Sequence, residues 1–429
     1  MAMSCNARGW TVVLAGTGTN LLLGILYTWS LFKDAINASL HQGGEGAFQW
    51  DPASLNDPYA VCCLMWGFAM LLGGKCQERV GPRVTAILGG VSLGAGFLLI
   101  SQTTSYAFWV LGFGVLFGTG IGLSYSAVLT ASLKWFPPQK TGLVAGLVVG
   151  GFGLASAYTA PLASWLLKSG GLAWTTMVIG IVFSVLVVLL ALPVRNPTSE
   201  ESDAVAQKGR TLGGNAALLA NKPSLSPLQV MRTRDFYVMW ILYFIGAGTG
   251  LMVISSLASM AKASLSDRAF VAISILAVGN AAGRVVAGFA SDHWGRTLTL
   301  ALVLGAQAIL MFLAIPVVTT PHAAAVLIIL LATLIGFNFG ANLSLFPAIT
   351  KDLWGPQHFG TNYGLMYIGW GLGGLVLCRI SEMMKAATGS FTLSFFTAGL
   401  LLSLAVVLLA VHSLLRKRGE SKAVTPGRF

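Results

Sequence analysis

The sequence GFASDHWGR, residues 288–296, places an acid, a glycine and an arginine in one short segment after a long apolar run. A related segment, GGKCQERVGPR at residues 73–83, has the same order of residue types nearly half a chain length earlier. A second pair, PQKTG at 138–142 and PQHFG at 356–360, is separated by almost the same interval. One glycine turn alone could merely cap a helix. Two paired turns at one interval predict an internal duplication, which is typical of transporters built from parallel repeats.

Long apolar runs flank these turns. A transmembrane helix needs about 20 mostly apolar residues, and six such runs lie on each side of a polar stretch. They lie near residues 10–32, 56–74, 83–101, 106–130, 141–167, 171–193, 236–260, 269–290, 298–318, 322–349, 360–386 and 391–414. We therefore predict an all-α membrane protein with twelve transmembrane helices in two six-helix bundles. The predicted bundles are residues 1–193 and 236–429, and a cytoplasmic linker at 194–235 joins them.

The composition supports a lipid environment. Only 9% of the residues are charged and 55% are hydrophobic, whereas a soluble domain averages about 25% charged residues. The net charge of +12 can indicate a nucleic-acid-binding protein, but here the basic residues are spread thinly over short loops. We predict the lipid bilayer as a partner and no nucleic acid.

The basic residues also predict the orientation. When the 26 lysines and arginines are assigned to the two ends of the predicted helices, most fall on the side shared by both termini and the linker. The positive-inside rule assigns that side to the cytoplasm. The sequence therefore predicts a multi-pass protein of the inner (plasma) membrane with both termini in the cytoplasm.

Arg284 is the most unusual residue within the apolar runs. It lies well inside the run 269–290, where a charged side chain costs about 2.5–3.5 kcal/mol on insertion scales. Such a residue is by default expected to bind a substrate or ion. Two structural alternatives stay open: the guanidinium can bond to backbone carbonyls, or it can extend to the aqueous interface.

The surroundings of Arg284 predict what it binds. The acidic residues of the sequence lie in loops or near the ends of the runs, so no deep carboxylate is expected to neutralise the arginine. A guanidinium presents a planar fork that suits carboxylate oxygens, and one cation matches one carboxylate. Asn280 lies four residues earlier on the same helix face. It can donate to a carboxylate or hydroxyl oxygen, or it can make an ordinary hydrogen bond between helices.

Enzyme and cofactor chemistry find no support in the sequence. The glycine-rich segment 112–122 lacks the preceding strand and the following acid of a dinucleotide site, so close helix packing explains it better. No Ser/His/Asp or Cys/His group converges within the apolar runs, and the five cysteines show no metal-ligand spacing. We predict a protein that is not an enzyme and holds neither a cofactor nor a metal.

Several stretches resemble a known transporter family. They are LYTWSL at 26–31, KWFPP at 134–138, MRTRDFYVMW at 231–240, LFP at 345–347 and NYG at 362–364. Together with the acid–glycine–arginine turns, they resemble the Major Facilitator Superfamily, and within it the branch of oxalate–formate antiporters and monocarboxylate transporters. The resemblance covers most of the chain and implies the fold of that superfamily.

The resemblance also implies roles for individual residues. Arg284 falls on the arginine that binds the substrate carboxylate in this branch. The implied aromatic surroundings of the substrate comprise two tyrosines, two phenylalanines that keep the ring, and a leucine in place of a tyrosine: Tyr27, Tyr125, Phe152, Phe339 and Leu343. Trp370 stands where the oxalate antiporter has a second cation, a lysine, and Asn280 stands where animal monocarboxylate transporters have an aspartate. The implied cargo is a small monocarboxylate such as lactate or pyruvate, not oxalate.

The coupling of transport is less constrained. The sequence predicts symport of the monocarboxylate with a proton, which travels on the substrate carboxyl or through an acid near a helix end such as Glu382. Exchange of one anion for another, as in an oxalate–formate exchanger, is one alternative because it needs no proton site. A carboxylate sensor built on a transporter scaffold is another. We expect a monomer.

Overall fold

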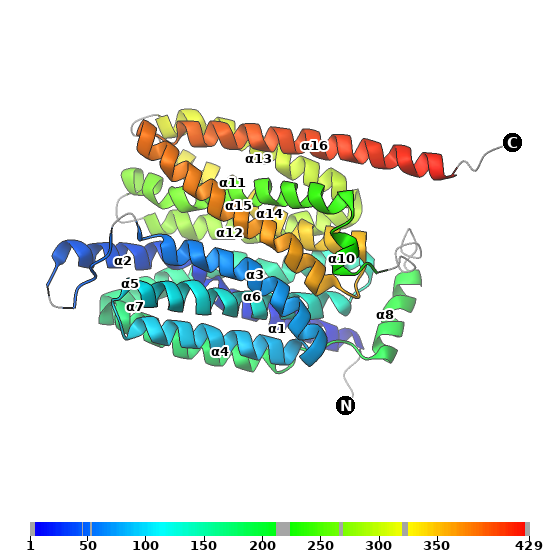
Figure 1. Ribbon diagram of the computed structural model, residues 1–429, viewed down its shortest axis with the longest axis horizontal. Helices are drawn as coiled ribbons and strands as arrows, with labels where there is room; N and C mark the ends of the chain where they lie inside the picture. Colours follow the sequence, from blue (N-terminus) through cyan, green and yellow to red (C-terminus); the bar gives the residue numbers. More distant parts are fainter. Residues whose placement is uncertain are drawn as a thin grey trace.

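The computed structural model describes residues 5–44, 46–51, 54–211, 224–265, 269–319 and 325–424. The regular secondary structure of these segments is helical throughout. Figure 1 shows most helices lying side by side along the long axis, with the helices of the first half gathered on one side and those of the second half on the other. The all-helical prediction is confirmed.

In the first half of the chain, helices begin and end at the turns predicted from the sequence. They are α1 (Cys5–Leu23), the 3₁₀ turn η1 (Gly24–Thr28), α2 (Trp29–Gln42), α3 (Asp57–Val80), α4 (Pro82–Ser101), α5 (Tyr106–Trp109), the π-helical segment η3 (Val110–Phe117), α6 (Gly118–Lys134), the 3₁₀ turn η4 (Pro138–Lys140) and α7 (Thr141–Ala191). The short linker helices are α8 (Ser199–Thr211) and α10 (Pro227–Val230). The second half contains α11 (Arg234–Leu265), α12 (Ala269–Trp294), α13 (Arg296–Thr319), α14 (Ala325–Trp354), α15 (Phe359–Thr388) and α16 (Thr392–Val424).

Within the described residues, 11 helices are long and apolar enough to cross a membrane. One of them, Thr141–Ala191, spans 51 residues and is interrupted at Gly171, whose backbone angles (φ 75°, ψ −173°) are not helical. Because only glycine adopts such a positive φ at low cost, this residue separates two helical arms. Counting both arms gives the twelve spans predicted from the sequence.

The first span differs from its prediction. We predicted one helix over residues 10–32, whereas η1 interrupts the path between α1 and α2. Gly24 begins this turn and lies so close to α7 that a Cβ there would be 2.7 Å from the carbonyl oxygen of Phe152. A 3₁₀ segment inside a long helix often marks a functional site or local strain. This turn carries Tyr27.

The duplicated turns have matching backbone geometry. Gly81, between α3 and α4, has a φ of 88°, and Gly295, between α12 and α13, has a φ of 90°. Both values lie in the left-handed region that favours glycine. The same conformation at equivalent positions of the two halves agrees with the duplication read from the sequence.

Ion pairs attach the described part of the linker to the first half of the chain. Glu201 of α8 accepts hydrogen bonds from both guanidinium nitrogens of Arg195, at 2.9 and 2.8 Å, and from Arg8 at 2.9 Å. The Arg195 hydrogen bonds, followed by the backbone N–H of Thr198, hold the pKa of this carboxyl well below its usual range. These contacts attach α8 to the start of α1 and to the end of α7. We call the end of the molecule that carries α8, the start of α1 and the end of α16 the linker end (Figure 1).

Candidate functional site

Arg284 is buried between the two halves. Its side chain belongs to α12 and is only 1% exposed. The guanidinium Nε donates to Oδ1 of Asn280 at 3.0 Å. Nη1 donates to the backbone carbonyl of Val149 on α7, and Nη2 lies 3.5 Å from the Tyr27 hydroxyl. The side chain therefore stays at depth, and of the two structural alternatives only bonding to a backbone carbonyl matches the geometry.

The charge of Arg284 is not neutralised by its contacts. An amide oxygen, a carbonyl and a hydroxyl surround it, and its contacts within the described part of the chain include no carboxylate. Burial of an uncompensated charge is costly. An anion that reached the guanidinium would relieve that cost, so the geometry favours an anionic ligand.

Glycines on α7 bring its backbone against Arg284. Gly146, Gly150 and Gly153 recur at intervals that place them on one face of the helix. A Cβ at Gly146 would lie 2.4 Å from the carbonyl oxygen of Arg284. A Cβ at Gly153 would lie 3.0 Å from Arg284 Nε. The missing side chain of Gly153 leaves room for the guanidinium, and that of Gly146 lets the backbone of α12 approach α7.

The opposite face of α7 is held by α1. Thr17 donates to the carbonyl of Leu147 at 3.2 Å, and Asn20 donates to the carbonyl of Val148 at 2.9 Å. With Arg284 on Val149, three successive carbonyls of α7 accept side-chain donors from both neighbouring helices. Thr17 and Asn20 are not among the site residues predicted from the sequence. The available signal was a polar pair deep in the first apolar run.

Phe152 joins Arg284 to a group of aromatic rings. The guanidinium carbon lies 5.8 Å from the centre of the Phe152 ring. Ring centres of Tyr27, Trp66 and Tyr125 lie 5.1, 4.8 and 6.2 Å from that of Phe152. The structure therefore brings together Arg284, Asn280, Tyr27, Phe152 and Tyr125, which the sequence analysis had named.

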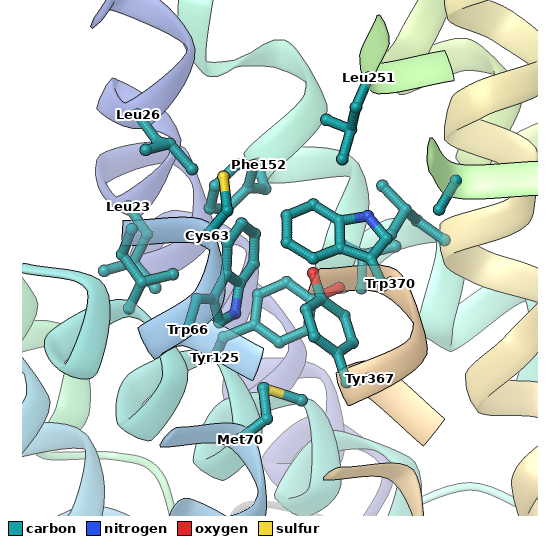
Figure 2. Close-up of a cluster of buried hydrophobic side chains, with 14 of the residues drawn as sticks. Leu23, Leu26, Cys63, Trp66, Met70, Tyr125, Phe152, Leu251, Tyr367 and Trp370 are labelled. Atoms are coloured by element: carbon teal, nitrogen blue, oxygen red, sulfur yellow. The ribbon is translucent and has the colours of Figure 1, made fainter. Parts of the chain in front are cut away.

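Trp370 belongs to the same group but approaches it from α15. Its ring centre lies 4.6 Å from Trp66 and 4.9 Å from Tyr367, and Tyr367 lies 5.8 Å from Tyr125 (Figure 2). Trp66 and Tyr367 are not among the site residues predicted from the sequence. Tyr367 precedes Trp370 by nearly one helical turn, which was a usable signal, whereas nothing distinguished Trp66 from other aromatic residues of the apolar runs.

Phe339 and Leu343 are buried on α14, away from the aromatic group around Phe152. The Phe339 ring packs toward Gly250 of α11, where a Cβ would lie 2.5 Å from a ring carbon. None of the ring contacts among the described residues joins Phe339 to Phe152 or Tyr125, and no described contact links Leu343 to Arg284. The side chain of Glu382 lies outside the described residues.

The described residues contain no group of three or more His, Cys, Asp or Glu side chains that could hold a metal ion. The groups that Arg284 contacts are an amide oxygen, a backbone carbonyl and a hydroxyl. This set suits hydrogen bonding to an organic ligand.

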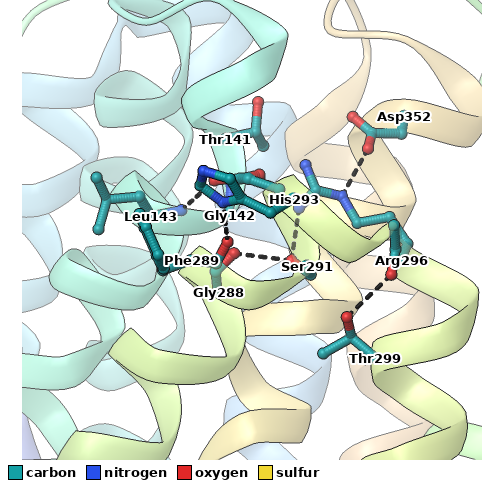
Figure 3. Close-up of polar contacts among 12 residues, drawn as sticks. Thr141, Gly142, Leu143, Gly288, Phe289, Ser291, His293, Arg296, Thr299 and Asp352 are labelled. Atoms are coloured by element: carbon teal, nitrogen blue, oxygen red, sulfur yellow. Dashed lines mark hydrogen bonds and ion pairs between the residues drawn. The ribbon is translucent and has the colours of Figure 1, made fainter.

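The two halves are also in close contact at the linker end. Asp292 of α12 accepts hydrogen bonds from the backbone N–H groups of Gly142 and Leu143, at 3.0 and 2.9 Å. These groups open α7, where the helix dipole favours a negative charge. Arg296 pairs with Asp292 at 2.6 Å and with Asp352 at 2.8 Å (Figure 3). The linker end is therefore bridged by charged contacts between the halves.

Lys351 adds a contact between the halves through a positive charge. Its Nζ donates to the carbonyl of Leu133, in the last turn of α6, at 2.8 Å, and to the Thr141 hydroxyl at 3.2 Å. A cation at a helix C-terminus and an anion at a helix N-terminus both match the helix dipoles. The segment between α6 and α7 is thus held from the second half at both of its ends.

We expect Asp292→Asn to loosen this contact. Hydrogen bonds to a charged group contribute about 1.5–3 kcal/mol each. The equilibrium between the closed and the open linker end should therefore shift toward the open state by about tenfold or more. Spin labels on the exposed residues Lys140 and Trp294 would report the distance between the halves. Glu78→Gln is the matched control, since the contacts of Glu78 among the described residues are a 3.3 Å bond from the Thr361 hydroxyl and His358 at 4.0 Å. An unchanged distance distribution in Asp292→Asn would show that this carboxylate does not hold the end closed.

Comparison with known proteins decides the family. Residues 9–377 and 271–428 match the model of the Major Facilitator Superfamily. The chain belongs to this superfamily. It is a multi-pass membrane transporter by fold and family, and its relatives include the branch that the sequence stretches resembled.

Two relatives and one solved structure of the superfamily show the range of similarity. The chain is 25% identical to the oxalate:formate antiporter of Oxalobacter formigenes over 84% of its own length and 81% of the relative. It is 25% identical to monocarboxylate transporter 13 of Rattus norvegicus over 91% and 86%. The solved proton:xylose symporter XylE bound to 6-bromo-6-deoxy-D-glucose is similar to it with a TM-score of 0.67 and 16% identity, over 95% of this chain and 96% of the other. The last similarity shows the fold alone.

Proposed function

We propose that this protein is a secondary active transporter of small monocarboxylates of the lactate and pyruvate kind. The observation that carries the proposal is Arg284. It is a buried cation on α12 that contacts α7 and has no carboxylate among its described contacts. The names of the relatives, an oxalate:formate antiporter and a monocarboxylate transporter, support an organic anion as cargo.

The geometry supports a specific binding step. Asn280 holds Nε, so the guanidinium keeps one orientation, and Nη1 and Nη2 face Val149 and Tyr27. An arriving carboxylate would compete with the Val149 carbonyl for Nη1, because charge-assisted hydrogen bonds are stronger than bonds to a neutral acceptor. In this proposal Asn280 positions the arginine and Tyr27 borders the carboxylate.

The transport cycle follows from the position of Arg284. The two bundles, residues 1–193 and 236–429, would move relative to each other and expose the site alternately to the two sides of the membrane. The linker end, closed by Asp292 and Lys351, would be one gate. We assign this end and both termini to the cytoplasm of a cell with the protein in its inner (plasma) membrane, in agreement with the distribution of basic residues.

Two modes of coupling fit this site. Symport with a proton is the first, with the proton carried on the cargo or by an acid elsewhere in the chain. Exchange of anions is the second, and one observation favours it: the described contacts of Arg284 include no carboxyl group that could take up a proton beside the cargo. In both modes Arg284 binds the carboxylate of the cargo.

Radiolabelled pyruvate uptake into proteoliposomes tests the proposal. We expect saturable uptake that unlabelled lactate and pyruvate inhibit, while oxalate inhibits weakly because the described surroundings of Arg284 offer no second cation to a second carboxylate. Uptake into empty vesicles under an inward proton gradient indicates symport, and uptake only into vesicles preloaded with a monocarboxylate indicates exchange. Absence of uptake in both settings would contradict the proposed function.

A further inference from the structure

Two polar side chains of α1 hold α7 at the level of Arg284. Asn20 Nδ2 donates to the Val148 carbonyl at 2.9 Å, and the Thr17 hydroxyl donates to the Leu147 carbonyl at 3.2 Å. Asn20 is fully buried, and its Oδ1 has no hydrogen-bond partner within the described residues. A buried amide with an unpaired oxygen is destabilising, so packing alone is a poor explanation for this side chain.

The next carbonyl of α7 accepts a hydrogen bond from the other half of the protein. Val149 receives it from Nη1 of Arg284, which belongs to α12. Successive carbonyls of an α-helix are rotated by about 100° around its axis, so one short stretch of α7 can face α1 with two carbonyls and α12 with the third. We call the hydrogen bond between Val149 and Arg284 the central lock, because it joins α7 of the first half to α12 of the second.

Glycines form the close contacts on both sides of this stretch. A Cβ at Gly151 would lie 2.2 Å from the carbonyl oxygen of Thr17 on α1, and a Cβ at Gly146 would lie 2.4 Å from that of Arg284 on α12. Backbone therefore meets backbone at these points, and interlocking side chains contribute little to the rotation of α7 there. At this level, the hydrogen bonds of Asn20 and Thr17 determine how α7 is rotated relative to α1.

We propose that Asn20 and Thr17 are positioning residues that hold the Val149 carbonyl against Arg284 and thereby set the affinity for the cargo. This inference rests on the proposed function, in which the cargo carboxylate takes Nη1 from that carbonyl. The carboxylate must open the central lock before it binds Nη1. The apparent affinity is therefore lower than that of a site whose lock is already open.

The direction of this effect distinguishes positioning from a role in folding alone. When α1 holds α7 less firmly, the Val149 carbonyl is no longer kept on Nη1, and the open state of the lock becomes more populated. Loss of either side chain of α1 should then tighten cargo binding. A residue that only supports the fold would leave cargo binding unchanged or weaken it.

Calorimetric titration of the purified protein with pyruvate tests the inference. Asn20→Leu removes the donor with little change in side-chain size. It should bind pyruvate about threefold to tenfold more tightly than the wild type, as expected for the loss of one neutral hydrogen bond. Thr17→Val should act in the same direction, and it provides the test if Asn20→Leu does not fold. Thermal unfolding of the same samples verifies that each variant is folded.

Thr19→Val is the matched control on the same helix. The buried Thr19 hydroxyl donates to the Ala15 carbonyl of its own helix at 2.9 Å, so the affinity of this variant should stay within about twofold of the wild-type value. Unchanged or weaker binding by folded Asn20→Leu, or by Thr17→Val in its place, would overturn the central lock while wild-type binding still supports the proposed function. An equal rise in Thr19→Val would overturn it too. If the wild type binds no pyruvate, the proposed function fails, and this inference with it.

Discussion

Arg284→Lys should lower pyruvate transport by about 100-fold or more while the protein still folds. Lysine keeps the positive charge but replaces a planar fork with a single ammonium. It cannot bond to Asn280 and Val149 at once and still face the cargo, so at least one charge-assisted hydrogen bond to the carboxylate is lost. Initial rates of radiolabelled pyruvate uptake, normalised to reconstituted protein, measure the effect.

Thermal unfolding of the purified variants separates transport from folding. Arg284→Lys and Arg284→Ala should unfold near the wild-type temperature, because neither leaves a carboxylate without its partner among the described contacts. Removal of an uncompensated buried charge can even stabilise the protein. Normal transport by Arg284→Ala would place the carboxylate site elsewhere.

Gly153→Ala should reduce pyruvate transport by at least tenfold, although alanine is the better helix former. The new Cβ would lie 3.0 Å from Arg284 Nε and 3.1 Å from the backbone nitrogen of Ala281. Overpacking of this kind costs about 1–3 kcal/mol, which exceeds the gain of at most about 1 kcal/mol from replacing a helical glycine. The guanidinium would be pushed from Asn280, and carboxylate binding should weaken accordingly. The apparent KM for pyruvate is the quantity to measure.

Gly150→Ala is the control on the same face of α7. A Cβ there would meet Val285 Cγ2 at 3.5 Å and the Ala281 carbonyl oxygen at 4.0 Å, which are ordinary contacts. Transport by Gly150→Ala should therefore remain near the wild-type rate, and its thermal stability should be equal or slightly higher. Equal transport by the two alanine variants would mean that α7 does not fix the position of Arg284.

The spans and turns could be predicted from the sequence because each depends on local composition. An apolar run of about 20 residues can hardly do anything but cross a bilayer or fill a core, and the turn at Gly295 requires a residue that tolerates a positive φ. Arg284 was identifiable for a similar reason, since a charge inside an apolar run is rare whatever its neighbours are.

The partners of these residues could not be predicted in the same way. The carbonyl of Val149 and the ring of Trp66 gain their roles only when α3, α7, α12 and α15 pack together. Asn280 illustrates the difference. Its spacing predicted a place beside Arg284, but only the structure shows that its oxygen accepts from Nε and thereby orients the arginine.

The 3₁₀ turn at Tyr27 and the helix α8 could also not be predicted from the sequence. Gly24 approaches the carbonyl of Phe152, a residue far away in the chain, and this contact has no local signature. The start of α8 is stabilised by Arg195 and Arg8 on Glu201. A polar stretch gives no sign of the ion pair with Arg8, which lies 193 residues away in the sequence.

Calorimetric titration of purified protein with pyruvate tests the central claim most directly, because it measures binding without the transport cycle. The wild type should bind pyruvate, and Arg284→Gln, which can keep a hydrogen bond but carries no charge, should lose about 100-fold or more in affinity. Thermal unfolding of the same samples verifies that the variant is folded. If folded Arg284→Gln bound pyruvate within about threefold of the wild-type affinity, Arg284 would not be the residue that binds the carboxylate.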